Sequence, residues 1–285
     1  MNYRHAFHAG NFADVVKHAV LALLIGRLQS KDTAFRVIDT HAAVGLYDLT
    51  ADEASRTGEW RDGVGRVWGA KRPSALDALL APYLAAVAAA NGAPEPAPLT
   101  RYPGSPWIAR HLFRRQDRLT AVELHPEDAN RLQALFAGDV QVRTIALDGW
   151  MALGAFVPPK ERRGLVLVDP PFEERDEFAT MTATFLAAYH KWPTGMYALW
   201  YPVKDLVAVD RFRIGLEKSG IRRLLRAELN VRERGADGTF NGTGLVICNP
   251  PWQFAETLET LLSGLVPLLA QGPGANCLVD EISGE

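Results

Sequence analysis

The chain has 285 residues, of which 48% are hydrophobic, so it can bury a substantial core as one large domain or one domain with an insert. Its formal net charge of −2 excludes a global basic field, and a nucleic-acid partner would have to bind local patches. Cys248 and Cys277 give neither a disulfide framework nor a metal-ligand spacing. Without a signal-peptide layout or an apolar run near the roughly 20 residues that span a bilayer, we expect a cytoplasmic protein.

The first predicted element is a helix over residues 11–29, where apolar side chains recur at helical spacing. Asn11 is placed to cap its N-terminus, and Asp14 follows three residues later as an acidic variant of the capping box. Because residues three and four apart are neighbours on a helix, Asp14, Lys17 and His18 are expected to share one polar face.

Strand-like apolar runs then alternate with helical stretches, which predicts an α/β fold with a mostly parallel sheet covered on both faces. The seven predicted strands are 35–41, 119–125, 140–148, 164–171, 195–202, about 222–231 and 244–251. The predicted helices between them are 105–115, 126–137, 174–191 and 203–219. The join "RERGADGTFNGTG" (232–244) is short and rich in Gly and Asn, so it fits a hairpin and predicts an antiparallel last strand.

Residues 51–100 differ in composition from the rest and predict a small inserted helical subdomain. The segment holds the alanine-rich "SALDALLAPYLAAVAAANG" and ends in "APEPAPL". Pro82 is expected to kink or split the main helix of the insert, because proline lacks the N–H that a helix interior needs. Residues 1–50 and 101–285 are then predicted to form the main domain.

Four predicted parallel strands end in polar residues, and in open α/β sheets ligands bind at the carboxyl ends of the strands. These strand ends are Asp39-Thr40-His41, Glu123, Asp148-Gly149 and Asp169-Pro170-Pro171-Phe172. The acid after the second strand suits the two ribose hydroxyls of an adenosine, and the Asp-Gly pair suits its adenine ring. Each acid alone could instead cap the following helix, but four acids at successive strand ends favour a ligand.

The loop after the first strand, "DTHAAVGLY", keeps only Gly45 of the several glycines that a dinucleotide loop usually carries. A pyrophosphate needs very close backbone approach, so a dinucleotide is disfavoured. S-adenosylmethionine has no phosphate, and it is the cofactor that this loop fits better.

Two segments have nearly the same sequence, "GLVLVDPPFEE" (164–174) and "GLVICNPPWQF" (244–254). Each has the Pro-Pro motif that is typical of the active site of a nitrogen methyltransferase. The amino group of a nucleobase is a poor nucleophile until a carboxylate and a backbone carbonyl accept its N–H bonds. Consecutive prolines present carbonyls rigidly, and a following aromatic ring can stack on the base. Asp169, Pro170 and Phe172 are therefore the candidate catalytic residues.

Strand direction separates the two copies. The strand before Asn249 is predicted to be antiparallel, so its end lies at the opposite rim of the sheet from Asp169. "NPPW" is accordingly interpreted as a structural turn, with Trp252 packed against the core.

The sequence resembles the ribosomal RNA large subunit methyltransferase J family, which methylates N(6) of one adenosine in 23S rRNA with S-adenosylmethionine. The residues that carry the resemblance span the chain: "YRHAFHAGNFADVVKH" (3–18), "DTHAAVGLY" (39–47), "RTGEW" (56–60), "YPGSPWIAR" (102–110), "ELHP" (123–126), "DG" (148–149), "DPPF" (169–172), "YALWYP" (197–202) and "NPPW" (249–252).

The resemblance implies a Rossmann-like class I methyltransferase with a helical insert. It implies that the cofactor or its pocket is contacted by His18, His41, Ser105, Glu123, Asp148, Gly149 and Asp169. Asp169 would be catalytic, and Tyr3 would help to gate the cofactor and engage RNA. Arg4 and Lys17, which border the expected entrance, are further candidate RNA contacts.

Two positions depart from the family pattern: Ala43 stands where Gly is typical, and Phe172 stands where Tyr is common. "DPPF" also occurs in guanine-N(2) rRNA methyltransferases, which keeps that activity as the nearest alternative. A non-catalytic RNA- or partner-binding protein and a protein-glutamine methyltransferase are weaker ones. We expect a monomer that acts on protein-free 23S rRNA, without a membrane partner and without a metal at His5, His8 and His18.

Overall fold

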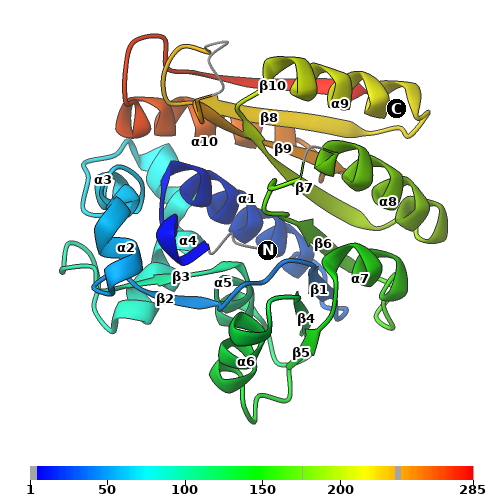
Figure 1. Ribbon diagram of the computed structural model, residues 1–285, viewed down its shortest axis with the longest axis horizontal. Coiled ribbons are helices and arrows are strands. Elements are labelled where there is room, and N and C mark those ends of the chain that lie inside the picture. The colour runs from blue at the N-terminus through cyan, green and yellow to red at the C-terminus, as the bar shows by residue number, and fades with distance from the viewer. Residues whose placement is uncertain (1–4, 175, 235–238, 285) are drawn as a thin grey trace.

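The computed structural model describes residues 5–174, 176–234 and 239–284, and an eight-stranded sheet runs through it (Figure 1). The strand order is β10-β8-β9-β7-β6-β1-β4-β5. In chain order these strands are β1 (Arg36–Asp39), β4 (Arg118–Glu123), β5 (Val142–Ala146), β6 (Gly164–Val168), β7 (Met196–Val203), β8 (Leu224–Asn230), β9 (Gly242–Cys248) and β10 (Asn276–Ser283). A separate two-stranded sheet pairs β2 (Leu46–Asp48) with β3 (Arg101–Pro103).

The pairing confirms the predicted α/β class. β1 pairs in parallel with β4 and β6, and β5 and β7 extend the parallel part on either side. β9 runs antiparallel between β7 and β8, as the hairpin predicted. The predicted count of seven strands was wrong, because β10 adds an eighth strand, antiparallel to β8. β10 pairs with one strand only, and none of its residues is fully buried, so "NCLVDEIS" (276–283) lacks the continuous apolar run of a central strand.

Helices cover both faces of the sheet. Neighbouring residues of a strand point to opposite faces, and in the central strands both sets are apolar, so each face needs a cover. Val37 and Leu165 contribute to one hydrophobic cluster, whereas Ile38 and Val166 contribute to the other. The first cluster is covered by α1 (Phe12–Gln29), α4 (Ser74–Asn91), α5 (Ser105–Leu112), α6 (Pro126–Leu135) and α10 (Phe254–Leu269). The second is covered by α7 (Gly149–Ala155), α8 (Glu177–Lys191) and α9 (Leu206–Lys218).

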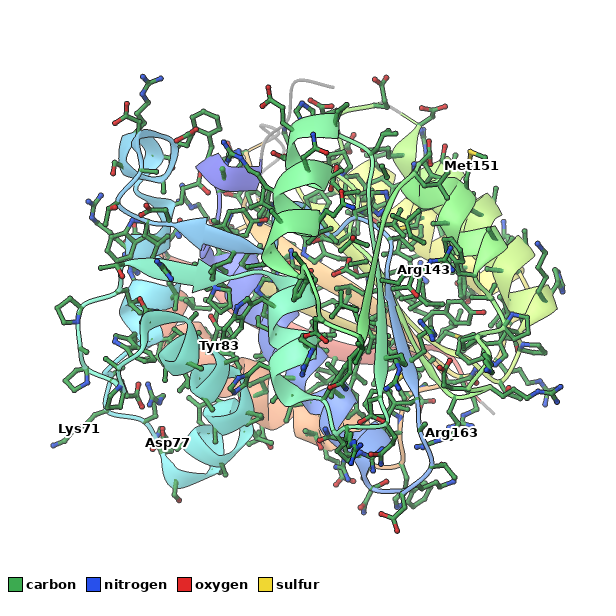
Figure 2. The ribbon with its side chains drawn as sticks, turned by 90° about the horizontal axis from the view of Figure 1, so that it is seen from below. Lys71, Asp77, Tyr83, Arg143, Met151 and Arg163 are labelled. Atoms are coloured by element: carbon green, nitrogen blue, oxygen red, sulfur yellow. The ribbon has the colours of Figure 1, made fainter. Side chains whose placement is uncertain are left out.

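The segment between β2 and β3 is helical, as predicted, and contains α2 (Asp52–Thr57), α3 (Val64–Val67) and α4. α4 is one continuous helix around Pro82, so the helix is not split. Its Tyr83 is buried in the same core as α1, whereas Lys71 and Asp77 lie at the periphery (Figure 2). Because α4 shares this core, the division into a main domain and an inserted subdomain stays a prediction.

α4 is also the one helix among the described residues that is long and apolar enough, by length and composition alone, to cross a membrane. A core helix of a soluble protein meets the same test. The residues that α4 buries in the core are Leu76, Leu80, Tyr83, Leu84, Ala86, Val87 and Ala90.

Asn11 caps the start of α1 as predicted, but Asp14 does not complete the predicted capping box. The Asn11 side chain accepts the backbone N–H groups of Ala13 and Asp14, each at 3.0 Å. In place of the reciprocal capping-box bond, the buried Asp14 carboxylate accepts the N–H of Gly10 at 2.8 Å. Asp14 therefore points into the protein, toward the candidate site.

The "NPPW" turn lies at the amino ends of β7 and β8. The Asn249 side chain donates to the carbonyl oxygens of Pro193 and Gly195, each at 2.8 Å, and both residues precede β7. The prediction that Trp252 packs against the core was wrong, because its side chain is 81% exposed. Gln253 takes a left-handed φ of 57°, and the buried Phe254 fills the core position instead.

Candidate active site

A cavity of about 300 Å³ opens at the carboxyl ends of β1, β4, β5 and β6. In Figure 2, Met151, just beyond the end of β5, and Arg163, just before β6, mark opposite edges of these strands. Every residue predicted to bind the cofactor lines this first cavity: His18, His41, Ser105, Glu123, Asp148, Gly149 and Asp169. Residues from six separate segments thus meet at one sheet edge, and their contact with the cofactor stays a prediction.

Glu123, the last residue of β4, is held in place by backbone hydrogen bonds. One carboxylate oxygen accepts the N–H of Ala43 at 2.8 Å, and the other accepts the N–H of His125 at 2.7 Å. Each oxygen has a second lone pair, so both can still accept a ribose hydroxyl. Burial raises the pKa of Glu123 above its usual value, although these backbone N–H groups act against the shift.

Asp148 combines the two roles that the sequence left open. Its Oδ1 accepts the N–H groups of Trp150 at 2.7 Å and of Met151 at 3.3 Å, so it caps α7. The same residue lines the cavity. A helix-capping carboxylate with its other lone pairs toward a cavity can also accept from an adenine amine.

Gly149 and His41 pack closely together beside Asp148 in the lining of the cavity. A Cβ at Gly149 would collide with the carbonyl oxygen of Thr40 and the ring of His41, so only glycine fits. The His41 ring lies edge-on to Trp150, with 5.0 Å between ring centroids. Burial lowers the pKa of His41 to about 4, which keeps the imidazole neutral near pH 7.

Asp39, the last residue of β1, is a buried carboxyl at the same edge. No group among the described residues donates to either of its oxygens with good hydrogen-bond geometry. Burial raises the pKa of Asp39 to about 7, while the nearby Ser105 hydroxyl and His41 backbone act in the opposite direction.

The charge of the first cavity also fits S-adenosylmethionine, whose net charge is positive. Lys17 is the one Lys or Arg among the described lining residues. The lining carboxylates are Glu123, Asp128, Asp148, Asp169, Glu174 and Glu177. When bound there, S-adenosylmethionine supplies a methyl group activated by a sulfonium.

The Asp169 carboxylate is paired with a buried lysine. Lys17 of α1 is 2% exposed, and its Nζ donates to Asp169 Oδ2 and contacts Asp14 Oδ1 at 2.8 Å. Although burial opposes the shift, the two carboxylates raise the pKa of Lys17. Lys17 therefore stays cationic and holds a positive charge against the Asp169 carboxylate.

Asp14 links this pair to the N-terminal segment. His5 Nε2 lies 2.9 Å from Asp14 Oδ2. Burial alone would raise the pKa of Asp14, but the interaction with His5, to which it is hydrogen-bonded, and the charge of Lys17 hold that pKa well below its usual value. Burial lowers the pKa of His18 to about 3, so that imidazole is neutral.

A second cavity of about 280 Å³ adjoins the first. Four residues line both cavities: His5, Lys17, Asp169 and Pro171. The second cavity is further lined by Pro170 and by three aromatic rings, Phe172, Trp200 and Phe240. A planar apolar ligand can stack in such a place.

Phe172 reaches this second cavity from a strained backbone position, with a φ of 52°. Its ring packs against Phe178 and Trp200, with centroids 4.8 Å and 5.8 Å apart. The Trp200 ring also lies 5.5 Å from Lys17 Nζ. Sequence reasoning did not assign Trp200 or Phe240 to the site, because each lies in a run typical of a strand or a hairpin.

The predicted RNA contacts are placed only in part. Lys17 lines both cavities, but it is buried between two carboxylates. Tyr3 and Arg4 lie outside the described residues. Among the residues that the structure describes, no three His, Cys, Asp or Glu side chains are arranged to hold a metal ion.

A mostly parallel sheet with carboxylates at four strand ends, a cavity that fits a cationic nucleoside, and a second cavity at the Asp169 motif together define a Rossmann-like class I methyltransferase. Residues 32–279 match the family model described as "RsmJ: Ribosomal RNA large subunit methyltransferase D, RlmJ". The chain therefore belongs to this family of S-adenosylmethionine-dependent rRNA methyltransferases.

Relatives that match over nearly the whole chain support this family membership. The chain is 40% identical over 271 residues to "Ribosomal RNA large subunit methyltransferase J" of Escherichia coli (strain K12), covering 94% of this chain and 95% of the relative. It is also 40% identical to the protein of that name from Haemophilus influenzae, covering 95% and 93%. A crystal structure of a protein from Legionella pneumophila superposes with a TM-score of 0.85 at 32% identity, covering 96% of this chain and 98% of that one.

Proposed function

We propose that this enzyme methylates the exocyclic N(6) amine of one adenosine in 23S rRNA. The observation that carries the proposal is the position of Asp169, which lines both the charged first cavity and the aromatic second cavity. A donor in the first cavity and a base in the second would meet at this carboxylate. The similarity to relatives named as large-subunit rRNA methyltransferases supports the substrate class.

The Asp169 motif supplies what an amine acceptor needs. The carboxylate accepts one N–H of the target amine, and the Pro170 carbonyl accepts the other, which frees the nitrogen lone pair. Pro170 and Pro171 have no N–H, so no backbone donor competes at this point. The Phe172 ring stacks on the base, which is worth about 1–3 kcal/mol.

Through the ion pair described above, Lys17 holds the Asp169 carboxylate in one orientation. A carboxylate acceptor fixed in this way lowers the barrier through positioning, since the methyl donor is already activated. Lys17 is therefore proposed as a positioning residue for the acceptor carboxylate, in addition to its predicted contact with RNA.

Both cavities are recessed, so we propose that the target adenosine leaves its stack before reaction. A single-stranded or loosened element of protein-free 23S rRNA satisfies this need. We propose a monomer as the working unit. Ribosomal RNA as substrate also supports a cytoplasmic location.

Guanine-N(2) methylation stays the alternative, because Phe172 lacks the hydroxyl of the tyrosine common in the family. The family match disfavours a non-catalytic role. A protein-glutamine substrate is disfavoured by the acid at position 169, since those enzymes favour Asn before Pro-Pro.

Methylation of naked 23S rRNA by the purified protein tests the proposal, with nucleosides identified by mass spectrometry. We expect N(6)-methyladenosine at one position and little reaction with assembled large subunits. N(2)-methylguanosine would contradict the base assignment, and activity restricted to intact subunits would contradict the substrate form.

A further inference from the structure

Glu177 is a buried carboxyl in the first cavity to which neither the motifs nor the resemblance assigns a role. It is the first residue of α8 and follows Asp169 by eight positions. Its side chain lines the cavity, although the residue is only 6% exposed. Its Oε2 atom is buried and accepts no hydrogen bond from the described residues.

Glu177 lies where negative charge is already concentrated. Burial raises the pKa of Glu177 to about 7, and the carboxylates of Glu173 and Glu174 add to the shift, against the backbone N–H groups of the same two residues. Asp148 and Asp169 line the same cavity. A buried carboxyl among like charges is stabilised most by a cation that enters the cavity.

No lysine or arginine among the described lining residues is available to supply that cation. Lys17 already pairs with Asp14 and Asp169, and the imidazoles of His18 and His41 are kept neutral by burial. The positive charge must therefore come from the ligand. S-adenosylmethionine carries one on its sulfonium, and its demethylated product has lost it.

We propose that Glu177 is a specificity-determining residue that makes the first cavity bind the cationic methyl donor in preference to the neutral demethylated product. The inference rests on the proposed function, in which the first cavity holds the donor. After methyl transfer the attraction to Glu177 disappears, so the spent cofactor leaves more readily and the enzyme escapes product inhibition.

A purely structural role for Glu177 makes a different prediction. As an acid in the first turn it also interacts favourably with the N-terminus of α8. If that were its only role, its removal would weaken donor and product binding equally. The ratio of the two affinities therefore separates the roles, and it does so independently of the fraction of protein that is folded.

The test is calorimetric titration of the full-length protein at pH 8.5 with S-adenosylmethionine and, separately, with S-adenosylhomocysteine. At an effective dielectric of about 20, a charge pair within roughly 8 Å changes affinity by at least about fivefold. Glu177→Gln is expected to lower donor affinity by about fivefold or more and product affinity by less than about twofold.

Asp176→Asn is the matched control, because it removes an exposed carboxylate one position away whose side chain makes no capping bond. It should leave the affinity ratio of the wild-type protein unchanged, and Glu177→Asp, which keeps the charge, should retain most of it. An unchanged ratio in Glu177→Gln overturns the inference, even though the wild type binds the donor. Failure of the wild type to bind either ligand would instead contradict the cofactor assignment.

Discussion

The two Pro-Pro motifs have nearly the same sequence but lie at opposite edges of the sheet. "DPPF" (169–172) follows the parallel strand β6, at the edge where both cavities open. "NPPW" (249–252) follows the antiparallel strand β9, at the edge where β7 and β8 begin. Strand direction alone therefore decides which copy can meet a cofactor.

Asp169 and Asn249, the first residues of the two motifs, also have different surroundings. Asp169 accepts a hydrogen bond from the buried Lys17 and lines two cavities. Asn249 donates to the carbonyls of Pro193 and Gly195, and its φ is 54°, a left-handed conformation that asparagine tolerates better than most residues. One motif thus presents an acceptor to a ligand, and the other closes a turn.

The largest effect is expected from Asp169→Asn. The amide cannot act as a charged acceptor, so methyl transfer to naked 23S rRNA should fall about 1,000-fold or more. Affinity for S-adenosylmethionine should change much less, as calorimetry will show. The double variant Asp169→Asn with Asn249→Asp should remain inactive, and recovered turnover in it would move the chemistry to the other edge.

Lys17→Met should have the next largest effect, because it leaves the buried Asp14 and the half-buried Asp169 without their common cation. We expect a loss of about 3 kcal/mol in the free energy of unfolding, measured by urea denaturation, and a large loss of activity. Lys204→Met is the control, since this exposed lysine also lines the second cavity. Equal stability of the two variants would contradict the proposed positioning role.

Removing the aromatic ring of each motif should change KM for RNA to different extents, by about tenfold in one motif and hardly at all in the other. Phe172→Ala removes a proposed stacking surface and should raise KM for RNA about tenfold. Trp252→Ala removes an exposed ring at the far edge and should leave KM within about twofold. Steady-state kinetics on the same RNA compare them, and a larger effect from Trp252 would reverse the assignment of the motifs.

The smallest effect is expected from Asn249→Ala. Loss of its two hydrogen bonds should lower the free energy of unfolding by about 1–2 kcal/mol. The kcat of the folded enzyme should stay at the wild-type value, because the turn is remote from both cavities. A fall in kcat without a change in stability would show that the turn has a functional role.

Much of the fold and site could be predicted, because periodicity and strand ends are local signals. The apolar spacing over 11–29 corresponds to α1, and the acids at strand ends all meet at one edge. The hairpin composition correctly predicted the antiparallel β9. The partly exposed edge strand β10 was missed because a strand that is not fully buried needs no continuous apolar pattern.

Side-chain surroundings were the part that the sequence could not supply. Lys17 on a helix face reads as solvated, but tertiary packing buries it between two acids. Trp252 reads as core, but the turn directs it outward and Phe254 replaces it. Glu177 reads as an ordinary first-turn acid, and only the structure shows that it lines the first cavity and that its Oε2 is buried without a hydrogen-bond partner among the described residues.

A crystal structure with S-adenosylmethionine bound tests the central claim most directly. The account predicts that the donor occupies the first cavity and that its methyl carbon points toward the Asp169 carboxylate, where the two cavities join. A methyl group directed toward the Asn249 edge, or away from the second cavity, would contradict it.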